Sequence, residues 1–188
     1  MQGIDLIFAI AVLLMSVVIH EVSHGYMAYY LGDPTAKYAG RLTLNPIKHL
    51  DLVGSIIVPI ITSLGGFVFG WAKPVPYNPY NLRHQRRDEL LVALAGPLSN
   101  ISLAILFGLI IRIGTPTGVL PDSFLSISSI IVVVNLVLAI FNLVPIPPLD
   151  GSKVLFNLLS PHHWKTFEFL HRYGFIILLF FIFFLWGL

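Results

Sequence analysis

The apolar stretch Ile4–Leu31 reads IDLIFAIAVLLMSVVIHEVSHGYMAYYL and decides the fold. A helix needs roughly 20 apolar residues to cross a hydrocarbon core about 30 Å thick, so this stretch is long enough to span a membrane. Its start carries Asp5 and no basic residue, and no small-residue cleavage pattern follows. A secretory signal peptide would need a basic residue at its start and a small-residue cleavage site after the apolar stretch. We therefore expect a membrane-spanning helix that is retained in the protein.

The composition of the whole chain also indicates a membrane protein. Of the 188 residues, 56% are hydrophobic and only 11% are charged, whereas about 25% are charged in an ordinary soluble domain. This composition excludes an ordinary soluble domain, a disordered chain and a nucleic-acid binder. The chain has no cysteine, so any metal must be bound by His, Asp or Glu. We expect a single integral membrane domain over residues 1–188.

Four further apolar stretches follow, separated by polar connectors: Leu52–Trp71, Leu90–Ile113, Leu125–Val144 and Phe175–Leu188. Of the 11 Lys and Arg residues, all but Arg112 lie in three of the connectors, and the connector 114–124 has none. Lys and Arg are enriched in the cytoplasmic loops of membrane proteins. We therefore expect these three connectors to face the cytoplasm.

The stretch Leu52–Trp71 is predicted to re-enter the membrane rather than cross it. A straight span would place the two most basic connectors on opposite sides, against the distribution of charge. The stretch also contains Pro59 and the pair Gly65-Gly66, which can open a helix into a bend. We predict a re-entrant hairpin or a buried helix pair, with a straight span as the alternative that length alone allows.

The first stretch contains the pattern H-E-x-x-H at His20-Glu21-Val22-Ser23-His24. Residues four apart lie on one face of a helix, one turn from each other. Both imidazoles can therefore reach one metal ion, and Glu21 can approach a water molecule beside it. An ionisable side chain in the middle of a membrane helix costs about 2.5–3.5 kcal/mol, so this cluster indicates function rather than chance. The sequence predicts a metal site.

A catalytic zinc usually takes three protein ligands and keeps one position open. Asp150 lies near the end of Asn142–Gly151, NLVPIPPLDG, where the prolines end a helix and favour a rigid, extended path. From the spacing alone, Asp150 could be either a ligand or a simple helix cap. Other acidic residues at helix boundaries are expected to be caps. His162-His163, after Pro161, is a less favoured candidate.

Two motifs in this order, His20–His24 and Asn142–Gly151, resemble the site-2 protease family of intramembrane zinc metalloproteases. AGPLSN at Ala95–Asn100 and GWAKPVP at Gly70–Pro76 also resemble segments of that family. The resemblance covers about residues 4–158. It implies a three-helix metalloprotease core, to which the hairpin at 52–71 and a C-terminal helix at about 166–188 are additions. The expected fold class is an all-α polytopic membrane protein.

The resemblance also implies roles for individual residues. It implies that His20, His24 and Asp150 bind one zinc ion per chain, that Glu21 is the general base, and that Asn142 helps to stabilise the oxyanion. For Asp150 to meet the two histidines, the first helix and Leu125–Val144 must run in the same direction. This requirement agrees with a hairpin at 52–71 that does not cross.

The expected activity is hydrolysis of peptide bonds in or near transmembrane segments of single-pass membrane proteins or signal anchors. The expected location is a prokaryotic cell membrane, with the active site toward the cytoplasm. The alternative is a non-catalytic zinc-binding or metal-carrier protein, which would need ligands but no Glu21. An unwound substrate could add to an enzyme strand. Thr35–Leu44 could form a small β-hairpin for this purpose or a plain basic loop, and Lys73–Pro76 is expected to be extended.

Overall fold

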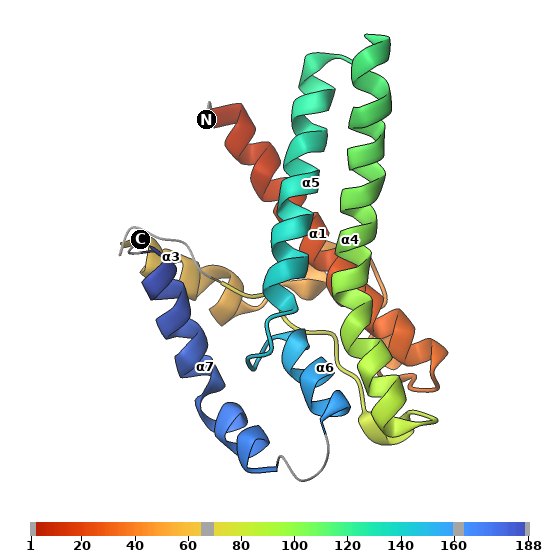
Figure 1. The fold of residues 1–188 in the computed structure, drawn as a ribbon, viewed down its shortest axis with the longest axis vertical. Helices are drawn as coiled ribbons and strands as arrows, with labels where there is room; N and C mark the ends of the chain where they lie inside the picture. The colour runs from red at the N-terminus through yellow and green to blue at the C-terminus, as the bar shows by residue number, and fades with distance from the viewer. Residues whose placement is uncertain (1–2, 65–69, 160–163, 187–188) are drawn as a thin grey trace.

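The computed structural model describes residues 3–64, 70–159 and 164–186, and all of its regular elements are helical (Figure 1). The helices are α1 (Gly3–Tyr30), α2 (Thr35–Tyr38), α3 (Val58–Leu64), α4 (Gln85–Thr117), α5 (Asp122–Asn142), α6 (Asp150–Leu158) and α7 (Trp164–Trp186). Short 3₁₀ turns occur at Pro46–His49 and Pro79–Asn81, and a π-helical turn at Val53–Ile57. The predicted all-α class is confirmed.

Three of the described helices contain segments long and apolar enough to cross a membrane. These segments are Phe8–Tyr30 in α1, Gln85–Pro116 in α4 and Asp122–Asn142 in α5. Helix α4 packs against both α1 and α5. Helices α1 and α5 run in the same direction and α4 runs in the opposite one (Figure 1). This is the arrangement that a shared metal site at the ends of α1 and α5 requires.

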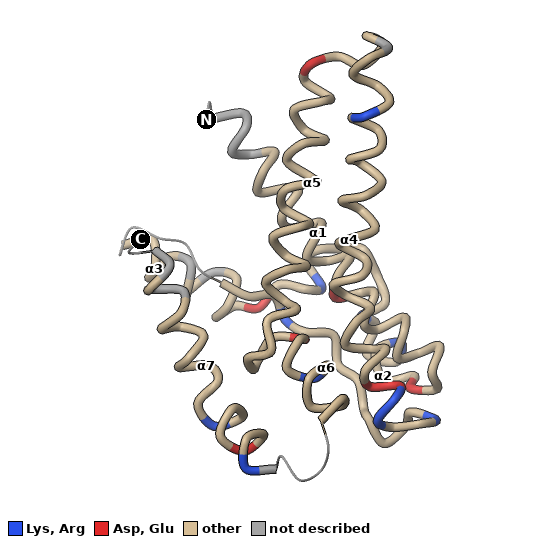
Figure 2. Tube along the Cα trace, in the orientation of Figure 1, with Lys and Arg blue, Asp and Glu red and all other residues tan. Residues whose placement is uncertain are grey.

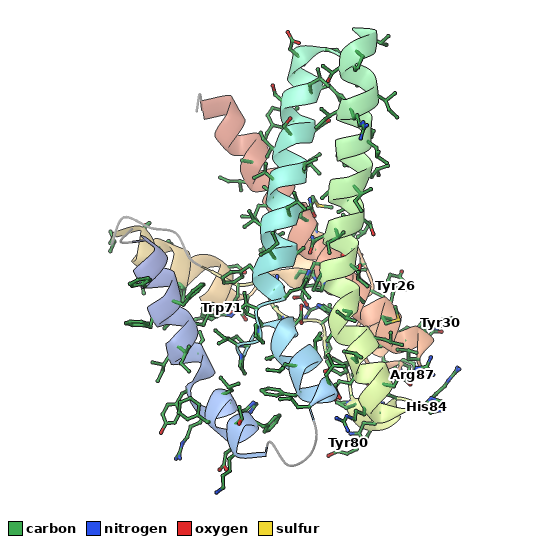
Figure 3. The ribbon with its side chains drawn as sticks, in the orientation of Figure 1. Tyr26, Tyr30, Trp71, Tyr80, His84 and Arg87 are labelled. Carbon is green, nitrogen blue, oxygen red and sulfur yellow. The ribbon has the colours of Figure 1, made fainter. Side chains whose placement is uncertain are left out.

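Charged residues are concentrated at one end of the three-helix core. They gather where α1 ends and α4 begins, whereas the far ends of α4 and α5 carry few charges (Figure 2). Tyr26, Tyr30, Tyr80 and Arg87 project at the charged end (Figure 3), and all three tyrosines are exposed. Tyrosine is enriched where membrane helices meet water, so this end has the composition of a membrane interface.

The two ends of the stretch 52–71 lie together. The Trp71 backbone N–H donates to Gly54 O at 3.0 Å, and the Ser55 hydroxyl donates to Trp71 O at 2.9 Å. An added Cβ on Gly54 would lie only 2.3 Å from Trp71 Nε1, so glycine permits this close approach. The two ends of the stretch therefore lie side by side, as the predicted hairpin requires, and its entry into the membrane stays a prediction. Its predicted bend at Gly65-Gly66 lies outside the described residues.

The predicted β-hairpin at Thr35–Leu44 is wrong, because Thr35–Tyr38 forms helix α2. The carboxylate of Asp33 accepts hydrogen bonds from Thr35 N at 3.1 Å and from Thr35 Oγ1 at 2.5 Å. Such local side-chain bonds start a helical turn and compete with strand pairing. Ala36 is then buried beside Gly25 of α1. No described residue is in a strand.

Helix α6 packs against α4, and α7 contacts the loop that precedes α6. The Arg86 guanidinium of α4 donates to Asn157 O, at 2.7 Å, and to Leu159 O, which satisfies carbonyls at the end of α6. Helix α7 contacts the proline-rich loop, since an added Cβ on Gly174 would lie 2.9 Å from Pro147 O. The predicted C-terminal helix is thus confirmed, and it packs beside the segment that leads to Asp150.

Candidate metal centre

The structure brings His20, His24 and Asp150 together from α1 and α6. His20 Nε2 and His24 Nε2 lie 3.0 Å and 3.1 Å from Asp150 Oδ2, and 3.1 Å from each other. All three residues are buried, with exposed fractions of 5%, 9% and 8%. Ligands of a tetrahedral zinc at 2.0–2.2 Å stand about 3.3 Å apart. The three donor atoms can therefore hold one metal ion.

The far nitrogens of both imidazoles are also bonded. His24 Nδ1 lies 2.6 Å from Val92 O, and His20 Nδ1 lies 2.6 Å from Asn100 Oδ1. Each acceptor is an oxygen, so each histidine donates from Nδ1 and keeps a lone pair on Nε2. A second hydrogen bond of this kind is typical of histidines that bind metals. The Nε2 lone pairs of His20 and His24 and the carboxylate of Asp150 repel one another unless a cation lies between them. The set of donor atoms therefore fits zinc.

Helix α1 places the two histidines, and α6 places Asp150. Val18 and Val22 of α1 are also buried. Residues two apart lie on opposite sides of a helix, so α1 is covered both on the side of the histidines and on the opposite side. Asp150 is the first residue of α6, after an extended Leu149. An added Cβ on Gly151 would lie 2.2 Å from Leu143 O, so a side chain there would push α6 away from the end of α5.

Gly96 of α4 lies directly against the two histidines. An added Cβ would lie 2.4 Å from His24 Nε2 and 2.6 Å from His20 Nε2. Any side chain at this position would occupy the space between the donor atoms. The segment AGPLSN therefore contributes to the metal centre itself.

Glu21, the predicted base, follows His20 on α1 and is half-buried. Its Oε2 accepts a hydrogen bond from Val75 N at 2.8 Å. Val75 lies between Pro74 and Pro76, in a segment without helix or strand, so its N–H is the only backbone donor of the three residues. The buried Arg41 donates to Lys73 O at 2.7 Å and holds the same segment.

Asn142, the other predicted catalytic residue, is the last residue of α5. Its amide donates to Leu138 O at 2.9 Å, one turn back on the same helix. Among the described residues it makes no hydrogen bond to His20, His24 or Asp150. The structure places Asn142 at the start of the loop that leads to Asp150, and its role stays a prediction.

Two of the other acidic candidates, Asp88 and Asp51, accept hydrogen bonds from backbone N–H groups at helix starts, as predicted for caps. Asp88 Oδ2 accepts from His84 N at 2.8 Å at the start of α4, and Asp51 Oδ1 accepts from Gly54 N at 2.6 Å. Asp33 is fully buried and braces the loop after α1. The candidates His162-His163 lie outside the described residues.

Sequence reasoning missed Asn135 and left Asn100 without a role. Both are fully buried, on α5 and α4. A usable signal was present, since a polar side chain within an apolar membrane helix is a functional hint. The oxygen of Val92 could not be found in this way, because every residue has a backbone carbonyl.

Comparison with known proteins identifies the family. The model of peptidase family M50 matches residues 8–120 and 110–184. The chain belongs to peptidase family M50. This is the site-2 protease family that the motifs resemble. The M50 chain is an integral membrane metalloprotease whose metal is zinc.

Three relatives bear names that describe candidate zinc metalloproteases. YwhC of Bacillus subtilis (strain 168) is 39% identical over 182 residues, which are 92% of this chain and 78% of that protein. Rip2 of Mycolicibacterium smegmatis is 34% identical over 176 residues, 91% of this chain and 64% of its own length. MJ0611 of Methanocaldococcus jannaschii is 45% identical over 64 residues, 34% of this chain and 31% of that protein. No solved structure matches the chain.

Proposed function

We propose that this M50 chain is an intramembrane endopeptidase that cuts peptide bonds in or near transmembrane segments. The observation that carries the proposal is the convergence of His20, His24 and Asp150 within 3.1 Å of one another, beside Glu21 and among apolar helices. In this proposal the three residues are the zinc ligands, with one zinc ion per chain.

Zinc held by His20, His24 and Asp150 would supply Lewis-acid chemistry: it would polarise a carbonyl and lower the pKa of a water molecule toward about 7. Glu21 accepts a proton from that water molecule while the water oxygen attacks the carbonyl carbon. Glu21 then delivers the proton to the amine nitrogen when the C–N bond breaks. The Val75 N–H holds one oxygen of Glu21 and thereby orients the carboxylate. The Asn142 amide is proposed as a donor to the oxyanion.

The proposed substrates are single-pass membrane proteins or signal anchors. A helical substrate hides its carbonyls in its own hydrogen bonds, so the region that is cut must unwind near the site. The concentration of charge and tyrosine where α1 ends and α4 begins supports an active site toward the cytoplasmic face of a prokaryotic cell membrane. Water would reach the site from that face.

The experiment uses the purified full chain in detergent micelles with a model single-pass membrane substrate. Glu21→Gln should keep about one zinc per chain, measured by elemental analysis, while cleavage falls about 10²–10⁴-fold because the general base is lost. Ser23→Ala is the matched control. Ser23 lies on the same helix and donates to Ile19 O, so this change should leave zinc content and cleavage unaltered.

Two outcomes would contradict the proposal. If Glu21→Gln cleaves as fast as the unaltered chain, Glu21 is not the base. If the unaltered chain binds zinc but cuts no membrane substrate, the alternative of a zinc-binding or carrier protein is correct. Membrane peptides that accumulate bound to the Glu21→Gln variant would identify the substrates.

A further inference from the structure

A chain of buried hydrogen bonds runs from α5 to the metal centre. Asn135 Nδ2 donates to Ile131 O on its own helix at 2.9 Å. Asn135 Oδ1 accepts from Asn100 Nδ2 at 2.7 Å, and Asn100 Oδ1 accepts from His20 Nδ1 at 2.6 Å. Both asparagines are 0% exposed, so water cannot replace any of these partners.

The direction of every bond in this chain is set by a backbone carbonyl, which can only accept. Ile131 O requires the Nδ2 group of Asn135, and this turns Oδ1 of Asn135 toward α4. Asn100 must then present Nδ2 to Asn135 and Oδ1 to His20. His20 must therefore carry its proton on Nδ1, and its Nε2 lone pair faces the other two ligands.

Helix α1 provides two further acceptors that agree with this direction. Asn135 Nδ2 lies 2.9 Å from Ser16 Oγ, and Asn100 Nδ2 lies 3.4 Å from Ser16 O. Ser16 is buried one turn before His20. The same chain of bonds thus joins α1, α4 and α5 next to the metal centre.

His20 needs this support more than His24 does. The tautomer of His24 is set directly by Val92 O, which cannot change from acceptor to donor. An asparagine amide can turn over and exchange its oxygen for its NH₂ group. A reversed Asn100 would offer N–H to His20 Nδ1 and favour the tautomer protonated on Nε2, which has no lone pair for a metal.

We propose that Asn135 is a positioning residue that acts through Asn100 to hold His20 in the tautomer that binds zinc. Among the described residues, Asn135 bonds to Asn100, Ser16 and Ile131 and makes no hydrogen bond to a metal ligand. The inference rests on the zinc ligands of the proposed function and not on proteolysis. Its test measures zinc affinity and the protonation site of His20, so it can fail while the proposed protease activity stands.

The first experiment replaces Asn135 by leucine in the purified full chain in detergent micelles. Asn135→Leu should weaken zinc binding about tenfold, measured by competition with a chelator of known affinity. In the zinc-free protein with ¹⁵N-labelled histidine, the His20 signal should shift from the Nδ1-protonated tautomer toward the Nε2-protonated one. The His20 signal is assigned by its absence in His20→Gln. Asn135→Ala, which adds no bulk, should behave in the same way.

Ser128→Ala is the matched control, because Ser128 is buried on the same helix and its hydroxyl has no hydrogen-bond partner among the described residues. It should change neither the zinc affinity nor the tautomer. The Asn100→Asp background gives the decisive comparison. Both oxygens of an aspartate accept, so His20 Nδ1 must donate whatever stands at position 135.

In that background, adding Asn135→Leu should cause no loss of zinc affinity. An equal loss in both backgrounds would show that Asn135 acts only by packing and would overturn the proposal. The proposal is also wrong if Asn135→Leu leaves the zinc affinity and the His20 tautomer unchanged in the otherwise unaltered chain.

Discussion

The metal centre has a helix side and a loop side, and they are built differently. On the helix side, α4 and α5 surround His20 with the fully buried amides of Asn100 and Asn135. On the loop side, Asp150 and Val75 reach the site from segments that lack regular structure before them. The amide oxygens and nitrogens of both asparagines have partners, as a membrane core requires.

This difference indicates that the two sides of the metal centre have different roles. Irregular backbone is tolerated at membrane depth only where it is buried in protein or lines a water-filled cavity. The loop side is therefore the side from which we expect water and substrate to arrive. The helix side is expected to set the geometry and protonation of the donors.

The largest effect is expected from the loop side. Asp150→Ala removes one of the three donor atoms and should lower zinc affinity by more than about 100-fold, since even outer partners of metal ligands contribute about 10–100-fold. Chelator competition and elemental analysis would measure the loss. Asp122→Ala is the control, because Asp122 is likewise the first residue of a helix. Retention of zinc by Asp150→Ala would mean that the third ligand lies elsewhere.

The helix side should be nearly as sensitive at Gly96. The added Cβ of Gly96→Ala would lie 2.4 Å from His24 Nε2, so zinc affinity should fall about 10–100-fold by displacement of the donors. Gly108→Ala is the matched control, since Gly108 lies on the same helix and has no atom within 4 Å of an added Cβ. If both variants bind zinc equally well, α4 does not confine the site as the structure indicates.

The two sides also differ in how far the sequence could predict them. The H-E-x-x-H spacing was enough to predict His20 and His24 as donors, whereas Asp150 was proposed only through the resemblance of NLVPIPPLDG to a family motif. The distribution of Lys and Arg favoured a hairpin at 52–71. These features are local patterns or follow from charge. The convergence of Asp150 with the histidines depends on the relative direction of α1 and α5, which the metal and the charge pattern both constrain.

What could not be predicted depends on contacts between distant segments. The partner of His24 is the backbone oxygen of Val92, and the partner of Glu21 is the backbone N–H of Val75. Nearly every residue has these backbone groups, so residue type does not show which of them will bond a site residue. The β-hairpin prediction failed for a local reason, because hydrogen bonds from Thr35 to Asp33 start a helical turn.

A smaller effect, confined to catalysis, is expected at Val75. Val75→Pro deletes the N–H that bonds Glu21 and should lower kcat about tenfold, because a hydrogen bond to a charged group contributes roughly 1.5–3 kcal/mol. Zinc content should stay the same. Val75→Ala keeps the N–H and controls for the lost side chain. Equal kcat values for the two variants would show that the loop side does not orient Glu21.

The smallest effect is expected farther out, at Asp33. Its carboxylate accepts from Thr35, Asn78 and Asn81 and joins the loop after α1 to the connector before α4. Burial alone would raise the pKa of Asp33, but the hydrogen bonds from Thr35, Asn81 and Asn78 outweigh it and hold the pKa below its ordinary value. Asp33→Asn should therefore destabilise the fold at neutral pH, by about 1 kcal/mol.

The pH dependence follows from the direction of that shift. A carboxyl whose pKa is lower in the folded state stabilises the fold above its unfolded pKa of about 3.9, and the stabilisation is lost as the pH falls. The Tm difference between the unaltered chain and Asp33→Asn should be constant near neutral pH and shrink below about pH 4. Thr35→Val removes one of the hydrogen bonds to Asp33 and should give a smaller loss with the same trend. If the Tm difference between the unaltered chain and Asp33→Asn grows on acidification, the ionised carboxylate does not stabilise the fold. The loop after α1 would then be held in place by packing.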